Sequence, residues 1–306
     1  MKVSIVVAVY QNVGTVAETH RRIQDVFRAQ LQRHSYELVF VDDGSRDGSL
    51  DELLRLRAED SAVKVVTFTR NFGQMAAMLA GFREATGDAV INISADLQDP
   101  IDLVPKMIEQ WEAGAETVIC YRTGRADTWT ARATSKVAYA LLRRALPQIP
   151  PGGFDVVLMD RRVMDAFNAI GVRHRFFQGD LLWTGYRLAF IPYERQARTV
   201  GRSQYNFGKR LKNFIDAFLD ASYLPIRFIS LVGTLTAGLG FLWAISIVVS
   251  WLAGDAPFTG WAPLMVAVLV VGGLIMLMLG MIGEYVWRIN EEVRKRPNYV
   301  VRDRYL

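Results

Sequence analysis

Short apolar runs alternate with longer amphipathic stretches over the first part of the chain. Five runs predict strands, at residues 3–10, 36–43, 63–70, 88–96 and 116–122. The stretches between them predict helices, at residues 14–32, 45–60, 72–86 and 100–114. This repeated strand–helix order predicts a doubly wound, mostly parallel α/β sheet.

Several of the predicted strands end in polar side chains, namely Asn12, Asp42, Asp43 and Asp96. Ligands of doubly wound sheets bind at the carboxyl ends of the strands, so these residues are the first candidates for a site.

Ser49 has Glu52 three residues later, and this spacing predicts that Ser49 caps the second helix.

The pattern changes near residue 228. Two apolar runs, Phe228–Leu252 and Trp261–Trp287, contain no Lys, Arg or His and are interrupted by a short Gly- and Pro-containing turn. Each run is long enough to cross a bilayer, which takes about 20 helical residues. We expect a transmembrane hairpin; the alternative is a pair of buried core helices. Glu284 is expected to reach the interface or to pair with Arg288.

Positive charges flank the hairpin on both sides, and the turn within it carries none. The positive-inside rule then places both chain ends in the cytoplasm. The segment before the hairpin, residues 207–226, has apolar residues at helical spacing and a basic face, which fits an interfacial amphipathic helix or an ordinary packed surface helix. Its position next to the first apolar run favours the interfacial helix. The predicted parts are a cytoplasmic α/β domain (1–206), this helix (207–226), the hairpin (227–289) and a basic cytoplasmic tail (290–306).

Composition excludes several classes of protein. Hydrophobic residues make up 51% of the 306 residues, too many for a disordered chain. The net charge of +5 is too small to indicate nucleic-acid binding by itself. The single cysteine, Cys120, excludes an internal disulfide framework and a Cys-based zinc site. The first ten residues read as a strand and not as a signal peptide.

The common nucleotide and hydrolase signatures, GxGxxG, GxxxxGK[ST] and GxSxG, do not occur in the chain. What remains are acids at strand ends. Asp42 and Asp43 precede two glycines, and their carboxylates could accept hydrogen bonds from a base or a ribose; the alternative is a turn with capping acids.

The sequence SADLQDP, residues 94–100, follows the fourth strand. Asp96 and Gln98 present oxygen ligands two residues apart and could hold Mg²⁺ or Mn²⁺ on a diphosphate. The alternative is a helix cap, because Asp99-Pro100 would open the next helix well.

Taken together, SIVVAVYQN, VDDGSRDG, RNFGQ and ADLQDP occur in one order along the chain. This combination resembles the family 2 glycosyltransferases of GT-A fold. With the C-terminal hairpin, the whole chain resembles the branch that acts on polyprenyl phosphates, which includes dolichol-phosphate mannose synthase and bacterial undecaprenyl-phosphate sugar transferases. No QxxRW motif of the processive members is present, so the resemblance implies a single sugar transfer.

The resemblance implies a role for the strand-end residues. The nucleotide would be held by Ala8, Val9, Tyr10, Asn12, Asp42, Asp43, Ser94 and Ala95. Asp96 and Gln98 would bind the metal, Mg²⁺ or Mn²⁺. Ser94 stands where the family has an acid, which is a departure from its pattern.

Further residues match the family's phosphate-binding positions. Arg122, Arg132 and Ser135 would approach the acceptor phosphate, and Asp155 would orient the sugar or the acceptor or stabilise charge at the anomeric carbon. A loop over the donor diphosphate would contain Arg198, Arg202 and Ser203. Val157 and Gln204 replace a family Arg and Lys. For each arginine the alternative is a surface ion pair.

The expected function is therefore a non-processive membrane glycosyltransferase that moves one sugar from a nucleotide diphosphate sugar, with UDP favoured, to undecaprenyl phosphate by inverting displacement. Asp96, Asp155 and Arg122 are its expected catalytic residues. The implied location is a bacterial inner membrane, crossed more than once, and the implied assembly is a homo-oligomer, with a tetramer suggested. The alternatives are a different lipid acceptor, a non-catalytic nucleotide-sugar scaffold, and a small transporter, which the nearly uncharged hairpin disfavours.

Overall fold

The structure is a computed structural model of residues 1–306, and it describes all of them except 124–142, 144–145, 152, 172–175, 195–223 and 254–261. The chain divides into two compact units. The first comprises Met1–Ala221 and Pro297–Leu306, and the second comprises Ser222–Arg296. Each unit is described separately below.

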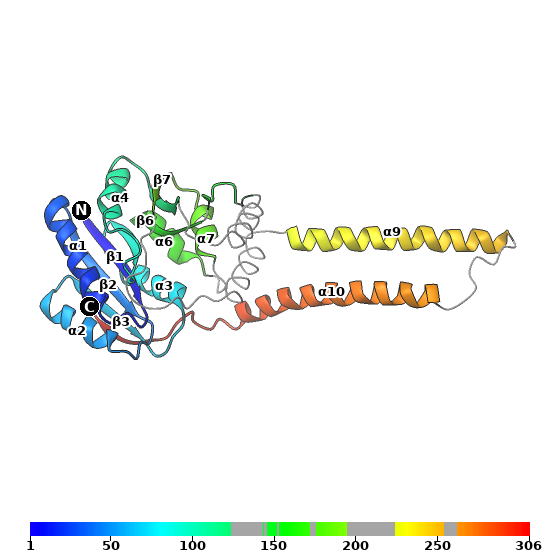
Figure 1. Cartoon of the computed structure of the whole chain (residues 1–306), viewed down its shortest axis with the longest axis horizontal. Coiled ribbons are helices and arrows are strands. Elements are labelled where there is room, and N and C mark those ends of the chain that lie inside the picture. The colour runs from blue at the N-terminus through cyan, green and yellow to red at the C-terminus, as the bar shows by residue number, and fades with distance from the viewer. Residues whose placement is uncertain (124–142, 144–145, 152, 172–175, 195–223, 254–261) are drawn as a thin grey trace. The chain divides into compact units, whose positions relative to one another are not determined.

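The first unit is built on one eight-stranded sheet with the strand order β7-β5-β6-β4-β1-β2-β3-β8 (Figure 1). Its strands are β1 (Lys2–Val9), β2 (Ser35–Asp42), β3 (Val63–Phe68), β4 (Ala89–Ser94), β5 (Thr117–Arg122), β6 (Phe154–Asp160), β7 (Leu188–Tyr193) and β8 (Val301–Tyr305). The pairs β1–β2, β1–β4, β2–β3 and β5–β7 are parallel. The pairs β3–β8, β4–β6 and β5–β6 are antiparallel, so the sheet is mixed.

Helices cover both faces of this sheet. Helices α1 (Val16–Gln30), α2 (Ser49–Glu59) and α4 (Leu103–Glu112) contribute to one apolar core. Helices α3 (Gln74–Glu84), α6 (Arg161–Ala169) and α7 (Phe177–Trp183) contribute to a second apolar core. Successive residues of β1 alternate between the two cores, as the pleat of a strand buried on both faces requires. The expected doubly wound α/β architecture is confirmed.

The end of the chain adds an edge strand that the sequence analysis did not predict. Residues 290–306 were expected to form a basic tail, but Val301–Tyr305 pair antiparallel with β3 as β8. Arg304 forms an ion pair with Glu84 at 2.8 Å, and Tyr299 stacks on Phe68 with ring centroids 4.9 Å apart. Two of the basic residues that suggested a tail, Arg302 and Arg304, lie on this strand, which is mostly exposed and protects the edge of β3.

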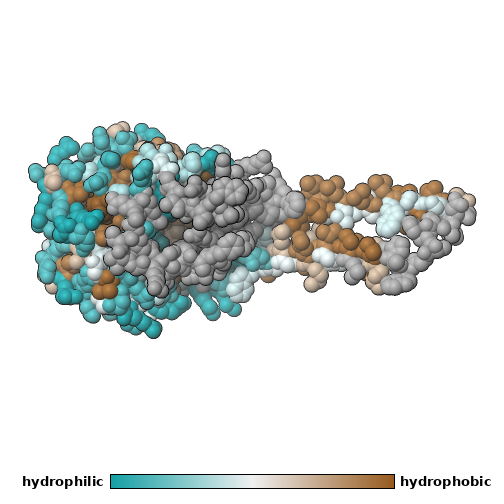
Figure 2. Space-filling view, in the orientation of Figure 1, coloured by the Kyte–Doolittle hydropathy of each residue, from teal (hydrophilic) through white to brown (hydrophobic). Residues whose placement is uncertain are grey.

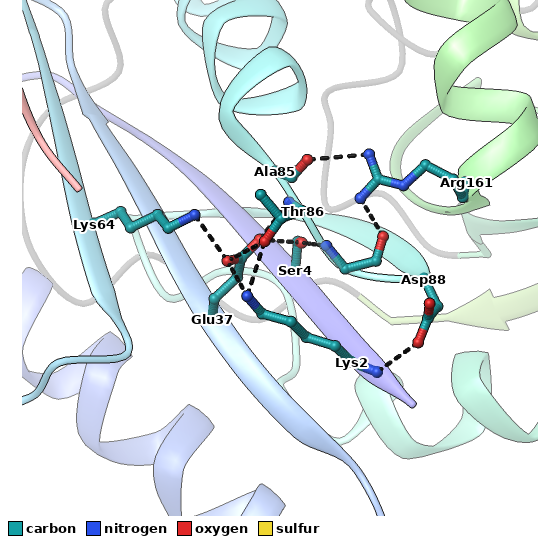
Figure 3. Close-up of polar contacts among 9 residues, drawn as sticks. Lys2, Ser4, Glu37, Lys64, Ala85, Thr86, Asp88 and Arg161 are labelled. Atoms are coloured by element: carbon teal, nitrogen blue, oxygen red, sulfur yellow. Dashed lines mark hydrogen bonds and ion pairs between the residues drawn. The ribbon is translucent and has the colours of Figure 1, made fainter.

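A buried polar cluster lies near the amino ends of β1, β2 and β3 (Figure 3). At its centre is Glu37 on β2, which is 2% exposed. Lys2 and Lys64 lie 2.6 Å and 3.0 Å from its carboxylate. The Ser4 hydroxyl and the backbone N–H and hydroxyl of Thr86 also donate to it. These contacts tie the amino ends of β1, β2 and β3 to the turn before β4.

Replacing Glu37 should destabilise the first unit. Burial alone raises the pKa of Glu37, but the hydrogen bonds from Lys2, Ser4, Thr86 and Lys64 outweigh it and hold the pKa well below its usual range. The stabilisation is therefore fully present at neutral pH and is lost as the pH falls below the ordinary glutamate range. We expect Glu37→Gln to lower the free energy of unfolding by about 2 kcal/mol at pH 7.

Denaturant unfolding at pH 7 and pH 4 measures this effect. The difference between Glu37→Gln and the wild-type protein should shrink at the lower pH. Glu59→Gln, on the exposed end of α2, is the matched control and should change little. A Glu37→Gln protein as stable as the wild type at pH 7 would contradict this role.

The second unit consists of two long helices, α9 (Leu224–Leu252) and α10 (Ala262–Val293). Its candidate membrane spans are Ile229–Ser250 and Leu264–Val293, with mean hydropathies of 2.0 and 2.7. In the described residues neither span is buried, whereas the core helix of a soluble domain would be mostly buried. Apolar side chains gather along both helices (Figure 2). By length and composition, these helices are consistent with the expected hairpin.

Contacts within the second unit also fit a hairpin. The backbone of Gly233 on α9 lies so close to Met278 on α10 that an added Cβ would lie 2.9 Å from the methionine methyl. Glu284 accepts a hydrogen bond from Arg288 one turn later, at 3.2 Å, as the sequence analysis expected. The predicted interfacial helix at 207–226 falls almost entirely outside the described residues, and its conformation stays a prediction.

Candidate functional site

The carboxyl end of β1 brings two acid clusters together. In the strand register, Val9 of β1 lies opposite Asp42 of β2, and Ala8 of β1 lies opposite Ser94 of β4. The DDGS and SADLQDP segments therefore begin on either side of one strand end. This juxtaposition of segments about fifty residues apart follows from the parallel β2–β1–β4 order, as expected for a doubly wound sheet.

The loop after β1 is fixed by side chains of the DDGS segment. The backbone N–H groups of Gln11, Asn12 and Val13 donate to Ser45 Oγ, Ser49 Oγ and Asp47 Oδ2, at 3.0, 2.9 and 3.1 Å. Gln11 has a positive φ of 54°, so this loop is sharply turned. Asn12 Oδ1 accepts from the backbone N–H of Tyr10 at 3.0 Å, which closes the turn.

The expected capping role of Ser49 is wrong. Helix α2 begins at Ser49 itself, and the capping residue is Gly48, whose φ is 95°. The Ser49 hydroxyl instead donates to Asp47 Oδ1 at 2.6 Å. Glu52 accepts from the backbone N–H groups of Gly14 and Ala17 at 2.8 and 3.0 Å. The spacing resembles a capping box, but the polar side chains satisfy the loop after β1 and the start of α1.

Asp42 and Asp43 are both 2% exposed and differ in what they hold. The two oxygens of Asp43 accept from the backbone N–H groups of Phe72 at 2.6 Å and Gly73 at 2.8 Å, so Asp43 positions the RNFG loop before α3. Both Asp42 oxygens accept from the backbone N–H of Ser45. Burial raises the pKa of both carboxyls, and these hydrogen bonds oppose the rise.

The SADLQDP loop has its own network of hydrogen bonds. The Ser94 hydroxyl lies 2.9 Å from Asp96 Oδ1 and 2.5 Å from Asp99 Oδ2. The backbone N–H of Gln98 donates to Asp96 at 3.2 Å, and Leu97 between them has a φ of 57°. Helix α4 begins only at Leu103, so the alternative reading of Asp99-Pro100 as its cap is wrong. The turn leaves Asp96 and Gln98 partly exposed at the strand end.

Asp99 joins this loop to the far side of the sheet. Tyr193, at the end of β7, donates its hydroxyl to Asp99 Oδ1 at 2.9 Å, and the same hydroxyl accepts from Arg122 Nε at 3.3 Å. Burial and the nearby Asp99 raise the pKa of Tyr193, so the phenol remains protonated near neutral pH and can donate. Ser94, Asp99, Tyr193 and Arg122 thus form one continuous chain of polar contacts.

Arg122 ends that chain beside Asp155. The guanidinium of Arg122, at the end of β5, forms a hydrogen-bonded ion pair with the Asp155 carboxylate on β6. Burial lowers the pKa of Arg122, but the Asp155 charge and Tyr193 outweigh burial and raise it, so Arg122 is charged. Asn92 on β4 holds β6 in place by bonding to Asp155 O at 2.6 Å and to Val157 N at 3.0 Å.

The oxygen ligands present fit a divalent cation that is held mainly by a ligand's phosphates. In the described part of the chain, no cluster of three or more His, Cys, Asp or Glu could hold a metal alone. The carboxylate of Asp96 and the amide oxygen of Gln98 belong to the hard-oxygen donor type that Mg²⁺ and Mn²⁺ prefer. One carboxylate with substrate phosphates and water is the usual Mg²⁺ arrangement.

The structure thus places most of the predicted site residues at one sheet edge. Ala8, Val9, Tyr10, Asn12, Asp42, Asp43, Ser94, Ala95, Asp96, Gln98, Arg122 and Asp155 all lie at or just beyond strand ends or, for Asp155, within β6. Arg132, Ser135, Arg198, Arg202 and Ser203 lie outside the described residues. Asp99, Tyr193 and Asn92 were not selected as site residues from the sequence. The only feature of the sequence that could have indicated one of them is that Asp99, an acid, directly follows the Asp96–Gln98 pair.

Comparison with known proteins identifies the class. Residues 4–154 match the model of glycosyl transferase family 2. The uncharacterized glycosyltransferase YkcC of Bacillus subtilis (strain 168) is 37% identical over 99% of this chain and 94% of its own length. The SfII prophage-derived bactoprenol glucosyl transferase of Shigella flexneri is 33% identical, covering 99% of this chain and 98% of that protein. The chain belongs to the family 2 glycosyltransferases and is a transferase.

Solved structures confirm the fold. The Pyrobaculum calidifontis mannosyltransferase PcManGT, in complex with GDP-Man and Mn²⁺, is similar with a TM-score of 0.51 at 20% identity, covering 90% of this chain and 80% of that one. Glucosyl-3-phosphoglycerate synthase of Mycobacterium tuberculosis, in complex with Mn²⁺, UDP-Glc and phosphoglyceric acid, also has a TM-score of 0.51 at 19% identity, covering 72% and 79%. At these identities the likeness carries the GT-A type of fold.

Proposed function

We propose that this enzyme transfers one sugar from a nucleotide diphosphate sugar to a polyprenyl phosphate at a membrane surface. The observation that carries the proposal is the polar chain from Asp96 through Ser94, Asp99 and Tyr193 to the Arg122–Asp155 pair. It brings a candidate metal-diphosphate ligand and a charged, fixed arginine to one edge of the sheet. The full-length similarity to a bactoprenol glucosyl transferase and the two apolar helices support a lipid acceptor.

The donor would lie over the carboxyl ends of β1, β2 and β4. Ala8, Val9, Tyr10, Asn12, Asp42, Asp43, Ser94 and Ala95 would line the nucleotide site. Asp96 and Gln98 would hold Mg²⁺ or Mn²⁺ on the diphosphate, where the cation offsets the charge of the leaving group. UDP is the favoured nucleotide, and the similar M. tuberculosis structure contains UDP-Glc with Mn²⁺.

The acceptor phosphate would lie against the Arg122–Asp155 pair. Arg122 presents a planar fork suited to phosphate, and Arg132 and Ser135 would add donors to the same group. The loop with Arg198, Arg202 and Ser203 would close over the donor diphosphate. Asp155, whose side chain is 54% exposed, can reach a bound sugar or stabilise positive charge at its anomeric carbon.

The transfer needs little proton chemistry. A phosphate oxygen of the acceptor forms a bond to the anomeric carbon, the bond from that carbon to the diphosphate breaks, and the nucleoside diphosphate leaves. The acceptor is already an anion near neutral pH, so positioning and charge stabilisation would supply most of the rate. Direct displacement inverts the anomeric configuration, which is our expectation for this enzyme.

The apolar unit would anchor the enzyme. Helices α9 and α10 would cross a bacterial inner membrane as a hairpin, with the catalytic domain and both chain ends in the cytoplasm. Two helices leave much apolar surface for packing between copies, and we propose a homo-oligomer, with a tetramer as the favoured state. The boundary at 206 remains part of this proposal, whereas helix α9 begins at Leu224 and helix α10 ends at Val293, so the two helices extend past the expected limits of 227 and 289.

Nucleotide release tests the function. Detergent-purified protein is supplied with a panel of UDP- and GDP-sugars, with and without Mg²⁺ or Mn²⁺ and undecaprenyl phosphate. We expect one donor to release its nucleotide only when both the metal and the lipid phosphate are present. Release with a phosphate-free lipid such as diacylglycerol would indicate another acceptor. Binding of a nucleotide sugar without release, for every donor and acceptor, would contradict an enzyme and favour a scaffold.

Asp43→Asn should weaken donor binding, because Asp43 is proposed to line the nucleotide site and its position is fixed by hydrogen bonds from Phe72 and Gly73. Asparagine keeps one accepting oxygen but places an NH₂ group opposite a backbone N–H donor, so either Phe72 or Gly73 loses its partner. We expect the donor Kd to rise roughly tenfold, which is the effect of one buried hydrogen bond. Calorimetric titration with the nucleotide diphosphate measures it. Asp51→Asn, exposed on α2, is the control, and equal Kd values for the two variants would contradict this role.

A further inference from the structure

Asp99 and Tyr193 are two polar residues that are almost completely buried. Asp99 is 4% exposed and Tyr193 is 5% exposed. Burying a carboxyl group is unfavourable unless its oxygens are hydrogen-bonded. Both Asp99 oxygens are engaged, one by the Tyr193 hydroxyl and the other by Ser94. The pair therefore links the SADLQDP loop, which contains Asp99, to the end of β7 by hydrogen bonds.

Tyr193 also fixes the end of β5. In the parallel β5–β7 register, Arg122 lies opposite Tyr193. The Tyr193 carbonyl accepts from the backbone N–H and the hydroxyl of Thr123, at 3.0 and 3.2 Å. The Tyr193 hydroxyl accepts from Arg122 Nε. One residue thus holds both the backbone after Arg122 and its guanidinium.

A guanidinium has five N–H donors in a rigid fork, so two fixed contacts set its plane and still allow it to bind a phosphate. In this chain the two contacts are Tyr193 at Nε and Asp155 at a terminal nitrogen. The side chain of Arg122 is only 15% exposed, so its position depends on these neighbours. If the Tyr193 contact were lost, Arg122 would keep only its contact with Asp155, whose side chain is mostly exposed.

We infer that Asp99 and Tyr193 are positioning residues. They orient the Arg122 guanidinium toward the acceptor phosphate and fix its position relative to the SADLQDP loop. This inference rests on the proposed function. The pair does not touch the reacting atoms. Its effect should fall on the acceptor and on turnover, and it should leave the affinity for the metal–nucleotide nearly unchanged.

The test compares Tyr193→Phe with Tyr121→Phe in the full-length protein. Both substitutions remove one phenolic hydroxyl, but Tyr121 precedes Arg122 on β5 and packs on the other face of the sheet. For Tyr193→Phe we expect the KM for undecaprenyl phosphate to rise about tenfold and kcat to fall, with the Kd for the nucleotide diphosphate and Mn²⁺ within about twofold of wild type. Tyr121→Phe should match the wild type.

A double-mutant cycle separates positioning from a general structural effect. In an Arg122→Lys background, which has no Nε–H fork to aim, Tyr193→Phe should have almost no further effect on transfer. Equal losses in both backgrounds, a changed donor Kd with an unchanged acceptor KM, or wild-type kinetics for Tyr193→Phe would each overturn the inference. Absence of transfer by the wild-type protein would instead count against the proposed function.

Discussion

Asp96→Asn should nearly abolish sugar transfer while leaving the fold intact. Asp96 is the one carboxylate of the SADLQDP loop that is both partly exposed and proposed as a metal ligand, and Ser94 and the Gln98 backbone hold it in place. Asparagine has the same shape but lacks the negative charge that binds a divalent cation. Without the cation, the charge that develops on the leaving diphosphate is not offset. We expect kcat to fall about a thousandfold.

Asp102→Asn is the matched control for this experiment. Asp102 is exposed on the same connection before α4, and its side chain does not cap that helix. It should retain wild-type activity. Mn²⁺ titration in the presence of the nucleotide diphosphate should show weak binding only for Asp96→Asn. A purified Asp96→Asn protein with near wild-type turnover would contradict the assignment of Asp96 as a metal ligand.

Arg122→Met should produce the second large loss. The substitution removes the fixed charge proposed to bind the acceptor phosphate and leaves Asp155 without its arginine partner. We expect kcat/KM for the lipid phosphate to fall about a thousandfold, because hydrogen bonds between a guanidinium and a phosphate are charge-assisted and bidentate. Arg122→Lys keeps the charge but not the fork, and it should retain part of the activity. Steady-state kinetics with varied undecaprenyl phosphate measure both variants.

Arg187→Lys serves as the control for Arg122. The Arg187 side chain is 73% exposed and pairs with Glu116 at 3.4 Å, and an exposed arginine in such a long contact contributes little to stability. Its substitution should not change the kinetics. If Arg122→Met raised the donor Kd and left the acceptor KM unchanged, Arg122 would belong to the donor side and the proposed division of the site would be wrong.

The parts of the fold that the sequence predicted well are those with local signals. Strands β1 to β5 are mostly buried and consist of nearly continuous apolar residues. Their positions and the polar residues at their ends were therefore predictable. The second unit was equally predictable, because two long apolar runs that lack Lys, Arg and His give two long apolar helices. The residues at the end of β1 and in the two acid segments were found for the same reason.

The missed features depend on pairing between distant segments. Strand β6 enters antiparallel between β4 and β5, and β7 adds parallel to β5, which local periodicity does not encode. Tyr193 therefore gave no sign that it faces Arg122 and Asp99 across the sheet. Asp99 looked like a helix-opening residue because Pro100 follows it. Strand β8 was missed because its basic residues suggested a tail, although their exposure on an edge strand explains them equally well.

The lipid product tests the central claim most directly. The protein is incubated with the donor that supports nucleotide release, a divalent metal and undecaprenyl phosphate. The molecular mass of the extracted lipid is then measured by mass spectrometry. We predict a lipid that retains its phosphate and gains one sugar residue, with none formed by Asp96→Asn. An unchanged lipid beside hydrolysed nucleotide sugar, or a lipid carrying several sugars, would contradict a single transfer to the lipid phosphate.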